Sequence, residues 1–287
     1  MKEAKFYKKL KNKIVQCQLC PHFCMIKDNN LGKCKVRKNI NGKIYSLSYG
    51  KPVSINLDPI TKKPLFHFLK NTLTFSIGMA GCNMSCLFCQ NWEISQKSAE
   101  EFDVKNILPK ELVDEVLKSG CPSISYTYSE PLVSFEYVFG IAKLAHKKGL
   151  KNILVTNGFV NPEPLKKIIP FIDAMNIDLK SFSDSTYRKF CGAKLQPVLE
   201  TIKMAHKAGI HLEITTLVIP GINDSEEEIK QIAKFIASID VNIPWHISRF
   251  FPKYKMKDKA FTSKQSLEKA YEIGKNAGLK YVHLGNI

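Results

Sequence analysis

From about residue 70 onward, short apolar runs alternate with stretches whose apolar residues recur at helical spacing, and this alternation limits the folds open to the chain. Strands and helices that alternate in this number form a parallel sheet, either doubly wound or curled into a full or partial barrel. Six strand–helix units and a last strand fit an incomplete barrel, so we expect an α/β fold with a partial (βα)6 barrel over residues 69–287. The expected strands are 72–78, 123–128, 152–157, 174–180, 211–219, 244–250 and 280–284, and the expected helices are 109–119, 134–148, 162–169, 195–208, 225–238 and 263–277.

Residues 1–68 have a different texture, and we expect them to form a small cysteine-rich region of their own. Short strand-like runs at 43–48 and 51–57 follow four cysteines, which are spaced by two, three and nine residues: Cys17, Cys20, Cys24 and Cys34. Four thiolates can close a tetrahedral zinc site or hold a second iron–sulfur cluster. A small region with little hydrophobic core needs a bound metal or another cross-link to be stable. Zinc, a cluster and free thiols all remain open, with His22 as a less favoured substitute ligand.

Composition and charge exclude several classes of protein. The start, MKEAKFYKKLKNK, is charged, and no apolar run approaches the roughly 18 residues that span a bilayer, so we expect a cytoplasmic protein with no membrane partner. Thiols stay reduced in that compartment, so clustered cysteines indicate metal. The net charge of +17 is almost all lysine and is spread along the chain. Because arginine makes the better bidentate phosphate contacts, this pattern argues against a nucleic-acid partner.

A second group of cysteines, Cys82, Cys86 and Cys89, lies in one short loop directly after the first expected strand. A cubane cluster needs thiolates that converge on neighbouring irons, and a compact loop can wrap around it to supply them. Three ligands leave one iron open, and an open position is what a catalytic metal site keeps. Three buried thiols, or a zinc site that lacks a ligand, fit the spacing less well. We therefore predict a [4Fe-4S] cluster at these cysteines.

The loop sequence, CNMSCLFC, resembles the C-x3-C-x-aromatic-C signature of the radical S-adenosylmethionine (SAM) superfamily. The resemblance implies that the open iron binds the amino and carboxylate groups of SAM. It also implies that an electron from the cluster cleaves SAM reductively to a 5′-deoxyadenosyl radical, which takes hydrogen from a substrate. The protein would supply binding, orientation and exclusion of water. Phe88 matches the aromatic position beside the adenine, and an electron donor such as ferredoxin or flavodoxin is implied.

Polar residues follow the expected strands at their C-terminal ends, where barrel enzymes place their sites. After the second strand, Glu130 resembles the glutamate of the family's Gly-Gly-Glu motif, and it would accept a hydrogen bond from the SAM ammonium. After the third, Thr156 and Asn157 resemble a turn that contacts the ribose. The fourth ends in Asp178 and Lys180, which are expected cofactor contacts, and Lys180 would meet the SAM carboxylate. Polar residues at several strand ends together are stronger evidence for a site than those at any single strand end.

Strand alternation predicts which side chains face the cavity. Asn176, Asp178 and Lys180 share one face of their strand, and a polar face is unusual in a parallel sheet that is buried on both sides, so we expect this strand to line a wet cavity. On the sixth strand, His246 and Arg249 point to opposite faces. We favour His246 as the inward residue and as a cofactor contact, because the activating enzymes described next have a histidine at the matching position.

Over nearly the whole chain the sequence resembles one branch of this superfamily, the AmmeMemoRadiSam-system radical SAM enzymes, which are similar to pyruvate formate-lyase activating enzymes. The segments that carry the resemblance are CQLCPHFC, DPITKKPLFHF, YTYSEP, VTNG, NIDLK, LVIPGIND and PWHISRF. Many members of that branch continue into a short tail with another cysteine pair, which this sequence does not contain. The resemblance implies a radical enzyme with an unknown small-molecule substrate or a partner protein as substrate.

Three other functions fit parts of this pattern. The first is an activase that installs a glycyl radical on a partner enzyme. The second is a zinc-stabilised binding protein without catalysis. The third is an RNA-modifying radical enzyme, which only the charge favours and no RNA-binding motif supports.

Two smaller sets of residues complete the expectations. Four polar residues in the link between the two regions could reach over the cavity, although most are expected as surface charge: Asp58, Lys62, Lys63 and His67. Cys121 and Cys191 are isolated, and a lone cysteine usually behaves as a small buried apolar residue. Cys191, beside a glycine, could instead donate hydrogen to a substrate radical, but this role is less favoured than that of a buried apolar residue.

Overall fold

The computed structural model describes residues 1–287, and its core is one curved sheet of eight strands. The order in space is β14-β13-β12-β11-β10-β9-β8-β7, with every neighbouring pair parallel except β7 and β8. The six strand–helix units and the last strand that the sequence predicts are confirmed as an open barrel. The strands are β7 (Pro52–Pro59), β8 (Leu73–Met79), β9 (Ser123–Thr127), β10 (Lys151–Thr156), β11 (Ala174–Asp178), β12 (His211–Val218), β13 (Trp245–Arg249) and β14 (Val282–Gly285).

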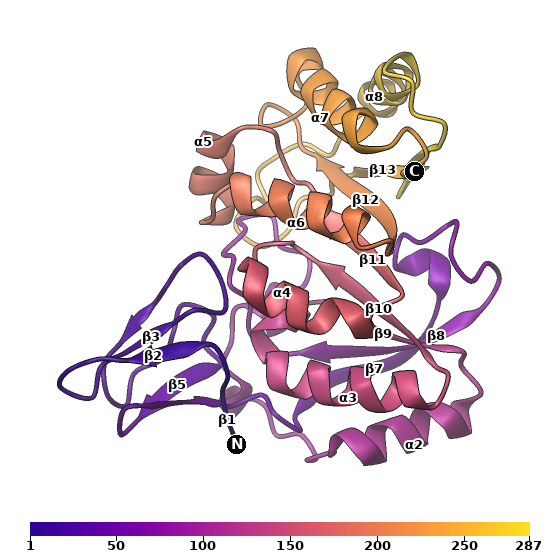
Figure 1. Ribbon diagram of the computed structural model, residues 1–287. Helices are drawn as coiled ribbons and strands as arrows, with labels where there is room; N and C mark the ends of the chain where they lie inside the picture. Colours follow the sequence, from indigo (N-terminus) through magenta and orange to yellow (C-terminus); the bar gives the residue numbers. More distant parts are fainter.

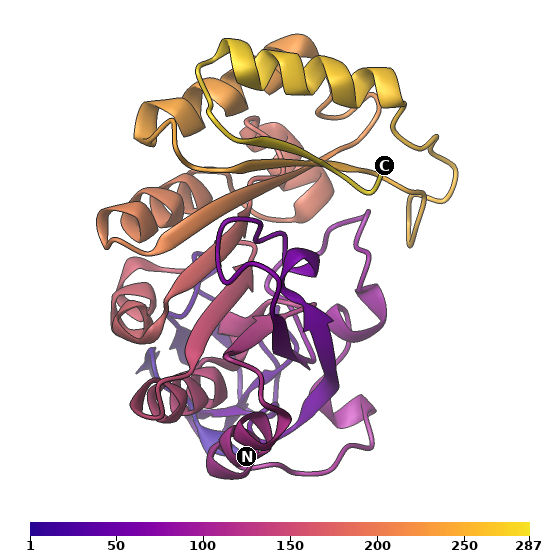
Figure 2. The same ribbon diagram turned by 90° about the vertical axis from the view of Figure 1, so that its right-hand side faces the viewer.

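Six helices cover the outer face of this sheet (Figure 2). Each has an apolar stripe at helical spacing; in α7, for example, Ile229, Ile232, Ala233 and Ile236 are buried, and the Ser225 hydroxyl caps the first turn. Burial of one such aliphatic side chain stabilises the fold by about 1.5–3 kcal/mol. The helices begin and end within a residue of the expected bounds: α2 (Pro109–Ser119), α3 (Phe135–Lys147), α4 (Pro162–Ile168), α6 (Gln196–Lys207), α7 (Glu226–Ile239) and α8 (Lys264–Asn276).

Apart from four 3-10 turns, three short helical elements were not expected from the sequence. They are α1 (Trp92–Ser95), α5 (Asp184–Thr186) and a π-helical turn at Tyr187–Cys191. Elements of three to five residues are too short to show a helical period, which explains why the pattern missed them. The π-helical turn ends at Gly192, in a left-handed conformation, and its last carbonyls face the loop that carries Cys82, Cys86 and Cys89.

The N-terminal region forms two small three-stranded sheets beside the barrel (Figure 1, indigo). One contains β1 (Lys2–Glu3), β6 (Lys43–Ser46) and β5 (Arg37–Ile40), and the other contains β2 (Tyr7–Lys9), β3 (Val15–Cys17) and β4 (Met25–Ile26). β7 lies within the 1–68 segment that we expected to stand apart, yet it pairs with β8 as the edge strand of the large sheet. Strand-like composition does not reveal a pairing partner, so its membership became visible only in the fold.

The link between β7 and β8 turns back into the curve of the barrel (Figure 2). The Pro64 carbonyl accepts a hydrogen bond from Asn176 Nδ2 at 2.8 Å, and the backbone N–H groups of Phe66 and His67 donate to the Glu213 carboxylate at 3.0 and 2.9 Å. The link thus lies inside the curve of the barrel, and its residues Lys62, Lys63 and Pro64 form part of the wall of a cavity at the C-terminal end of the sheet. No helix of the protein has both the length and the apolar character needed to cross a membrane.

Candidate functional site

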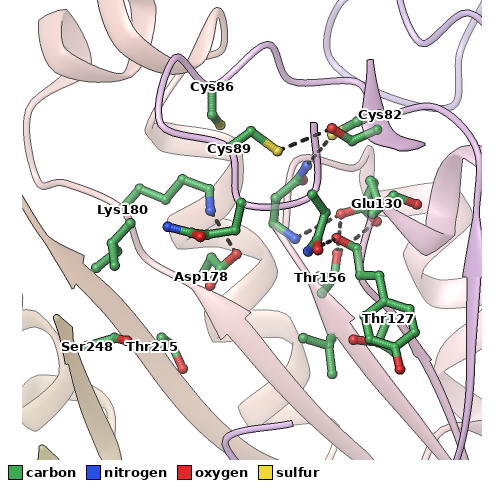
Figure 3. Close-up of a pocket in the computed structure, with 18 of the residues that line it drawn as sticks. Cys82, Cys86, Cys89, Thr127, Glu130, Thr156, Asp178, Lys180, Thr215 and Ser248 are labelled. Atoms are coloured by element: carbon green, nitrogen blue, oxygen red, sulfur yellow. Dashed lines mark hydrogen bonds and ion pairs between the residues drawn. The ribbon is translucent and has the colours of Figure 1, made fainter. Parts of the chain in front are cut away.

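A cavity of about 600 Å³ lies at the C-terminal ends of the parallel strands. Its lining contains nine expected metal or cofactor residues from the cysteine loop and three strand ends, and also Lys62 and Lys63 of the link: Cys82, Cys86, Phe88, Cys89, Glu130, Thr156, Asn157, Asp178 and Lys180. Figure 3 shows the cysteines on one side of the cavity, with Lys180 and Asp178 at one end beneath them and Glu130 with Thr156 at the other. Residues almost 100 positions apart therefore face a single space.

The cysteine loop is held by backbone contacts on both sides. Gly81 has φ +87°, and a Cβ atom there would lie 2.5 Å from the Cys34 carbonyl oxygen, so only glycine fits. The backbone N–H groups of Ser85 and Leu87 donate to the carbonyls of Cys191 and Phe190, both at 2.9 Å. The π-helical turn thus carries the outer half of the loop, which fixes where the three sulfurs point.

Each loop sulfur has a polar neighbour in the protein. The backbone N–H of Met84 lies 3.3 Å from Cys82 Sγ, and Ser95 Oγ lies 3.2 Å from Cys89 Sγ. Burial raises the pKa of Cys82 well above its ordinary value, whereas a hydrogen bond from the Cys191 thiol lowers the pKa of Cys86. Donors of this kind stabilise the thiolate form that a metal needs.

The donor set suits an iron–sulfur cluster. Three thiols from one loop line a cavity that has space for further groups, which fits three-point ligation with an open iron. No group of three or more His, Cys, Asp or Glu side chains in the protein is already spaced as around a bound ion, so the sulfurs would close around the cluster as it binds.

Glu130 is a buried carboxylate with hydrogen-bond donors but no cation. It is 3% exposed, and it accepts hydrogen bonds from Thr156 Oγ1 at 2.8 Å, from the Asn157 N–H at 2.8 Å and from the Leu132 N–H at 3.0 Å. Burial outweighs these donors and raises the pKa of Glu130 to about 7. A positively charged group in the cavity would supply the charge that this carboxylate lacks.

Lys180 is the cation at the other end of the cavity. Its Nζ lies 2.7 Å from Asp178 Oδ2 and 6.0 Å from the centroid of the Phe88 ring. Burial acts to lower the pKa of Lys180, but Asp178 and the Cys86 thiol act against it, and the pKa is raised well above its ordinary value. A permanent positive charge therefore stands beside the cysteine loop, opposite Glu130.

Thr156 and Asn157 line the cavity but have polar side-chain atoms already bound to the protein. Thr156 donates its hydroxyl to Glu130, as described above. Asn157 Nδ2 donates to Asn83 Oδ1 at 2.9 Å, and Asn157 Oδ1 accepts from the Phe159 N–H at 2.9 Å. The geometry makes them positioning residues for Glu130 and the cysteine loop, and it gives the expected ribose contact no direct support.

His246 is the expected site residue that the fold keeps out of the cavity. It faces inward, as expected, while Arg249 packs against Phe261 on the other side of the strand. However, His246 Nε2 lies 2.6 Å from Glu213 Oε2, and the Phe66 ring of the link packs on it at 4.7 Å between centroids. The link covers this level of the barrel, and Ser248, two residues further along, lines the cavity instead of His246.

The wall beside Glu130 contains residues that sequence reasoning undervalued. Asp58 and Lys63 are 4% and 1% exposed, so the expectation of surface charge is wrong for both. Lys63 Nζ lies 2.6 Å from Asp58 Oδ2, and the Tyr128 hydroxyl also donates to Asp58. Tyr128 has φ +69° and stands where the family motif has a glycine. The sequence signal for this wall was the tyrosine in place of the motif's glycine, because a non-glycine residue with positive φ is strained and strained backbone often marks a functional site.

Comparison with known proteins gives the same picture. Residues 76–236 match the family model of the Radical SAM superfamily. An uncharacterized protein of Methanocaldococcus jannaschii is 44% identical over 288 residues, covering 100% of this chain and 86% of that protein. A putative glycyl-radical enzyme activating enzyme of the same organism is 28% identical over 62% of this chain and 72% of its own length. The pyruvate formate-lyase-activating enzyme of Clostridium pasteurianum is 25% identical, over 55% of this chain and 67% of that enzyme.

Solved structures share the fold at low identity. Streptococcus suis SuiB bound to S-adenosylmethionine has a TM-score of 0.57 at 13% identity, over 76% of this chain and 52% of SuiB. A radical SAM methyltransferase from Sphaerobacter thermophilus has a TM-score of 0.54 at 15% identity, over 76% of this chain and 67% of that one. Because the family match spans more than half of the residues and includes the cysteine loop, this chain belongs to the radical SAM superfamily, whose enzymes use a [4Fe-4S] cluster and SAM.

Proposed function

We propose that this enzyme holds its [4Fe-4S] cluster through Cys82, Cys86 and Cys89 and cleaves SAM reductively in the cavity above the barrel. The observation that carries the proposal is that these thiols open onto the same space as an unpaired buried carboxylate, Glu130, and a partly buried cation, Lys180. When bound, the cluster supplies one electron and SAM supplies the 5′-deoxyadenosyl radical that takes hydrogen from the substrate. The protein's own groups bind, orient and exclude water.

The two ends of the cavity suit the two charges of an amino acid. Glu130 is positioned to accept hydrogen bonds from an ammonium, since three protein donors already hold its carboxylate in one orientation. Lys180 would meet the carboxylate, with Asp178 holding its Nζ in place until then. The Phe88 ring lies next to Lys180 and offers the adenine an apolar face. Opposite charges at opposite ends fix the direction in which the methionine part binds.

The substrate is either a small molecule or a partner protein. The relatives named as activating enzymes favour a second, narrower candidate, an activase that installs a glycyl radical on a partner enzyme. The third candidate is a binding protein without catalysis, and cofactor cleavage would eliminate it. We also propose a cytoplasmic location and an electron donor of the ferredoxin or flavodoxin type. The chain's net charge of +17 favours an acidic donor.

We further propose a second metal site at the N-terminal cysteines, for zinc or a second iron–sulfur cluster. These cysteines line a small cavity of their own, apart from the one that contains Cys82, Cys86 and Cys89: Cys17, Cys20, Cys24 and Cys34. The cofactors of the protein would then be the catalytic cluster, SAM and this second metal group.

Anaerobic reconstitution tests the proposal directly. Protein loaded with iron and sulfide, reduced with dithionite and given SAM should produce 5′-deoxyadenosine and methionine. Its electron paramagnetic resonance (EPR) signal should change when SAM is added. Cys121→Ser is the matched control, because Cys121 is buried outside both cysteine groups and its loss should leave the signal and the cleavage unchanged. A reduced cluster that neither responds to SAM nor cleaves it would contradict the proposal. Product analysis with candidate partner proteins then separates the activase from a small-molecule enzyme.

A further inference from the structure

We propose that the N-terminal cysteines bind a single zinc ion and that the Arg37 guanidinium donates its Nε hydrogen to one of the zinc-bound thiolates. The four ligands are Cys17, Cys20, Cys24 and Cys34. This inference extends the second metal site proposed above by naming its occupant, by adding a residue that partners the thiolates, and by giving the site a structural role toward the catalytic loop.

The four cysteines come together from three separate segments. Cys17 ends β3, Cys20 and Cys24 flank the turn before β4, and Cys34 precedes β5. Cys17, Cys20 and Cys34 are buried, Cys24 is partly buried, and none forms a disulfide. All four line one cavity, although the outer two ligands are 17 positions apart in the sequence. Four thiols in one place are the complete ligand set of a structural zinc site.

The backbone around these sulfurs already donates to them. The Lys33 N–H lies 3.5 Å from Cys24 Sγ. Burial raises the pKa of Cys34 to about 11, and the Val36 N–H beside its sulfur acts in the opposite direction. Burial likewise raises the pKa of Cys20, opposed by the His22 N–H. The Cys20 and Cys34 sulfurs each face the N–H of the second residue after the cysteine, which is the relation that Cys82 has with Met84 in the catalytic loop.

Arg37 supplies an independent observation. Its side chain is 1% exposed and lines the cysteine cavity. Its Nη1 contacts both Glu136 oxygens at 3.2 Å, and its Nη2 donates to the Lys5 carbonyl. Its Nε is one of only three buried side-chain polar atoms in the protein that have no hydrogen-bond partner. A buried donor without an acceptor is costly, and a thiolate made by metal binding would be its acceptor.

The size of the cavity decides between a zinc ion and a cluster. The space among the four cysteines is about 10 Å³, which is room for about one water-sized sphere. A [4Fe-4S] cubane has eight atoms in its core and would have to push the two small sheets apart. The catalytic loop, by contrast, borders about 600 Å³. A single ion matches a space of this size, with the four sulfurs closing around it, and its binding releases the thiol protons to solvent with no change in oxidation state.

The proposed zinc site touches the base of the catalytic loop. His22 Nε2 donates to the Asn83 carbonyl at 2.7 Å, and the Cys34 carbonyl packs against Gly81 so closely that no side chain would fit there. Asn83 and Gly81 are the two neighbours of the cluster ligand Cys82. A zinc ion that holds the turns around Cys20 and Cys34 would therefore hold Cys82 in place, which makes it a positioning element.

Metal analysis of full-length protein without the catalytic ligands tests the occupant. The Cys82→Ser/Cys86→Ser/Cys89→Ser variant, purified anaerobically, should contain about one zinc per chain and no stoichiometric iron or sulfide. Adding Cys20→Ser should abolish the zinc, whereas adding Cys121→Ser should not. Iron with sulfide in the triple variant would overturn the zinc assignment, and absence of metal would overturn the site. Neither result depends on SAM cleavage, so failure here is distinct from failure of the proposed function.

Cobalt provides a readout that needs no substitution at the four N-terminal cysteines. The triple variant freed of zinc and titrated with Co²⁺ alone should develop the visible absorption of tetrahedral thiolate-bound cobalt and lose it when Zn²⁺ is added. Octahedral cobalt spectra, or none, would contradict a closed four-thiolate site.

The Arg37 contact has its own test. Arg37→Lys keeps the positive charge but loses the Nε donor together with the Nη contacts to Glu136 and Lys5, so zinc should transfer to a chelator at least about tenfold faster than from the parent protein. Lys38→Ala is the matched control, because it removes a neighbouring charge that faces away, and it should leave the rate unchanged. An unchanged rate in Arg37→Lys would refute the Nε contact while leaving the zinc assignment standing.

Discussion

The two groups of cysteines in this protein differ in what surrounds them more than in their own chemistry. Cys82, Cys86 and Cys89 come from one loop and border a cavity of about 600 Å³. The four N-terminal cysteines come from three segments and enclose about 10 Å³. Three ligands beside a large space suit a metal centre that must admit a second molecule, and four ligands around a small one suit a closed site. The number of thiols and the volume of the space beside them together distinguish a catalytic site from a structural one.

The charges around the two groups differ in the same way. Arg37 beside the N-terminal cysteines is already paired with Glu136, and only its Nε hydrogen is left without an acceptor. In the catalytic cavity Glu130 has no cationic partner at all, and Lys180 is paired only with the partly exposed Asp178. Unpaired charge is costly to bury, and it is kept where a charged ligand will pair with it.

The largest expected effect separates the two groups outright. Cys82→Ala should abolish the catalytic cluster's EPR signal and SAM cleavage, because two thiolates cannot hold a cubane with one iron left open. Zinc content should stay at that of the wild type. Iron analysis, EPR and product assay on the same preparation check this. Retention of both signal and cleavage would show that the cluster lies elsewhere.

The next largest effect is expected at the N-terminal cysteines, where stability should be lost and the catalytic cluster largely kept. Cys20→Ser should lower the free energy of unfolding by roughly 3–5 kcal/mol, since a structural metal couples its binding to folding, while most of the catalytic cluster is retained. Denaturant unfolding gives the stability, and iron content gives the cluster. His22→Ala, which removes the contacts to the Asn83 carbonyl and the Phe159 ring but no cysteine, should destabilise far less. If Cys20→Ser lost the cluster with no change in stability, the assignment of roles to the two groups would be wrong.

A smaller effect is expected within the catalytic cavity. Glu130→Gln keeps the shape of the side chain but removes the charge that would meet the SAM ammonium. Loss of one charge-assisted hydrogen bond costs about 1.5–3 kcal/mol, so the affinity for SAM should fall about tenfold to a hundredfold with iron content unchanged. Lys180→Met should weaken binding through the carboxylate in the same way. Titration of SAM into each variant measures this, and wild-type affinity in both would mean that SAM binds elsewhere.

The smallest effect is a pH dependence that only the catalytic cavity should show. The pKa of Glu130 is raised to about 7, so the charged form that binds an ammonium is lost as pH falls through that value. Affinity for SAM should be about tenfold lower at pH 6 than at pH 8, and Glu130→Gln should remove the difference. The same raised pKa means that the carboxyl contributes most to stability below its ordinary pKa of 4.5 and loses that contribution as pH rises through about 7. A pH-independent affinity would contradict the assigned role.

Much of this protein could be predicted from local patterns. The alternation of strand and helix depends on apolar residues spaced two to four positions apart, so neighbouring residues are enough to predict it. The observed elements agree with the prediction to within two residues at almost every end. The cysteine loop was predictable for the same reason, because its three ligands lie within eight residues. Glu130, Asp178 and Lys180 followed from one rule: in a parallel barrel the strand ends meet at one face.

What the tertiary structure decided depends on residues far apart in the chain. The environment of His246 could not be predicted from its own strand, because its neighbours Phe66 and Glu213 come from two other elements. Asp58 and Lys63 are charged, and only their mutual pairing inside the barrel wall makes burial tolerable. The choice between zinc and a cluster is of the same kind. Cysteine spacing names the ligands, but the volume they enclose and the unpaired Nε of Arg37 arise only when three segments pack together.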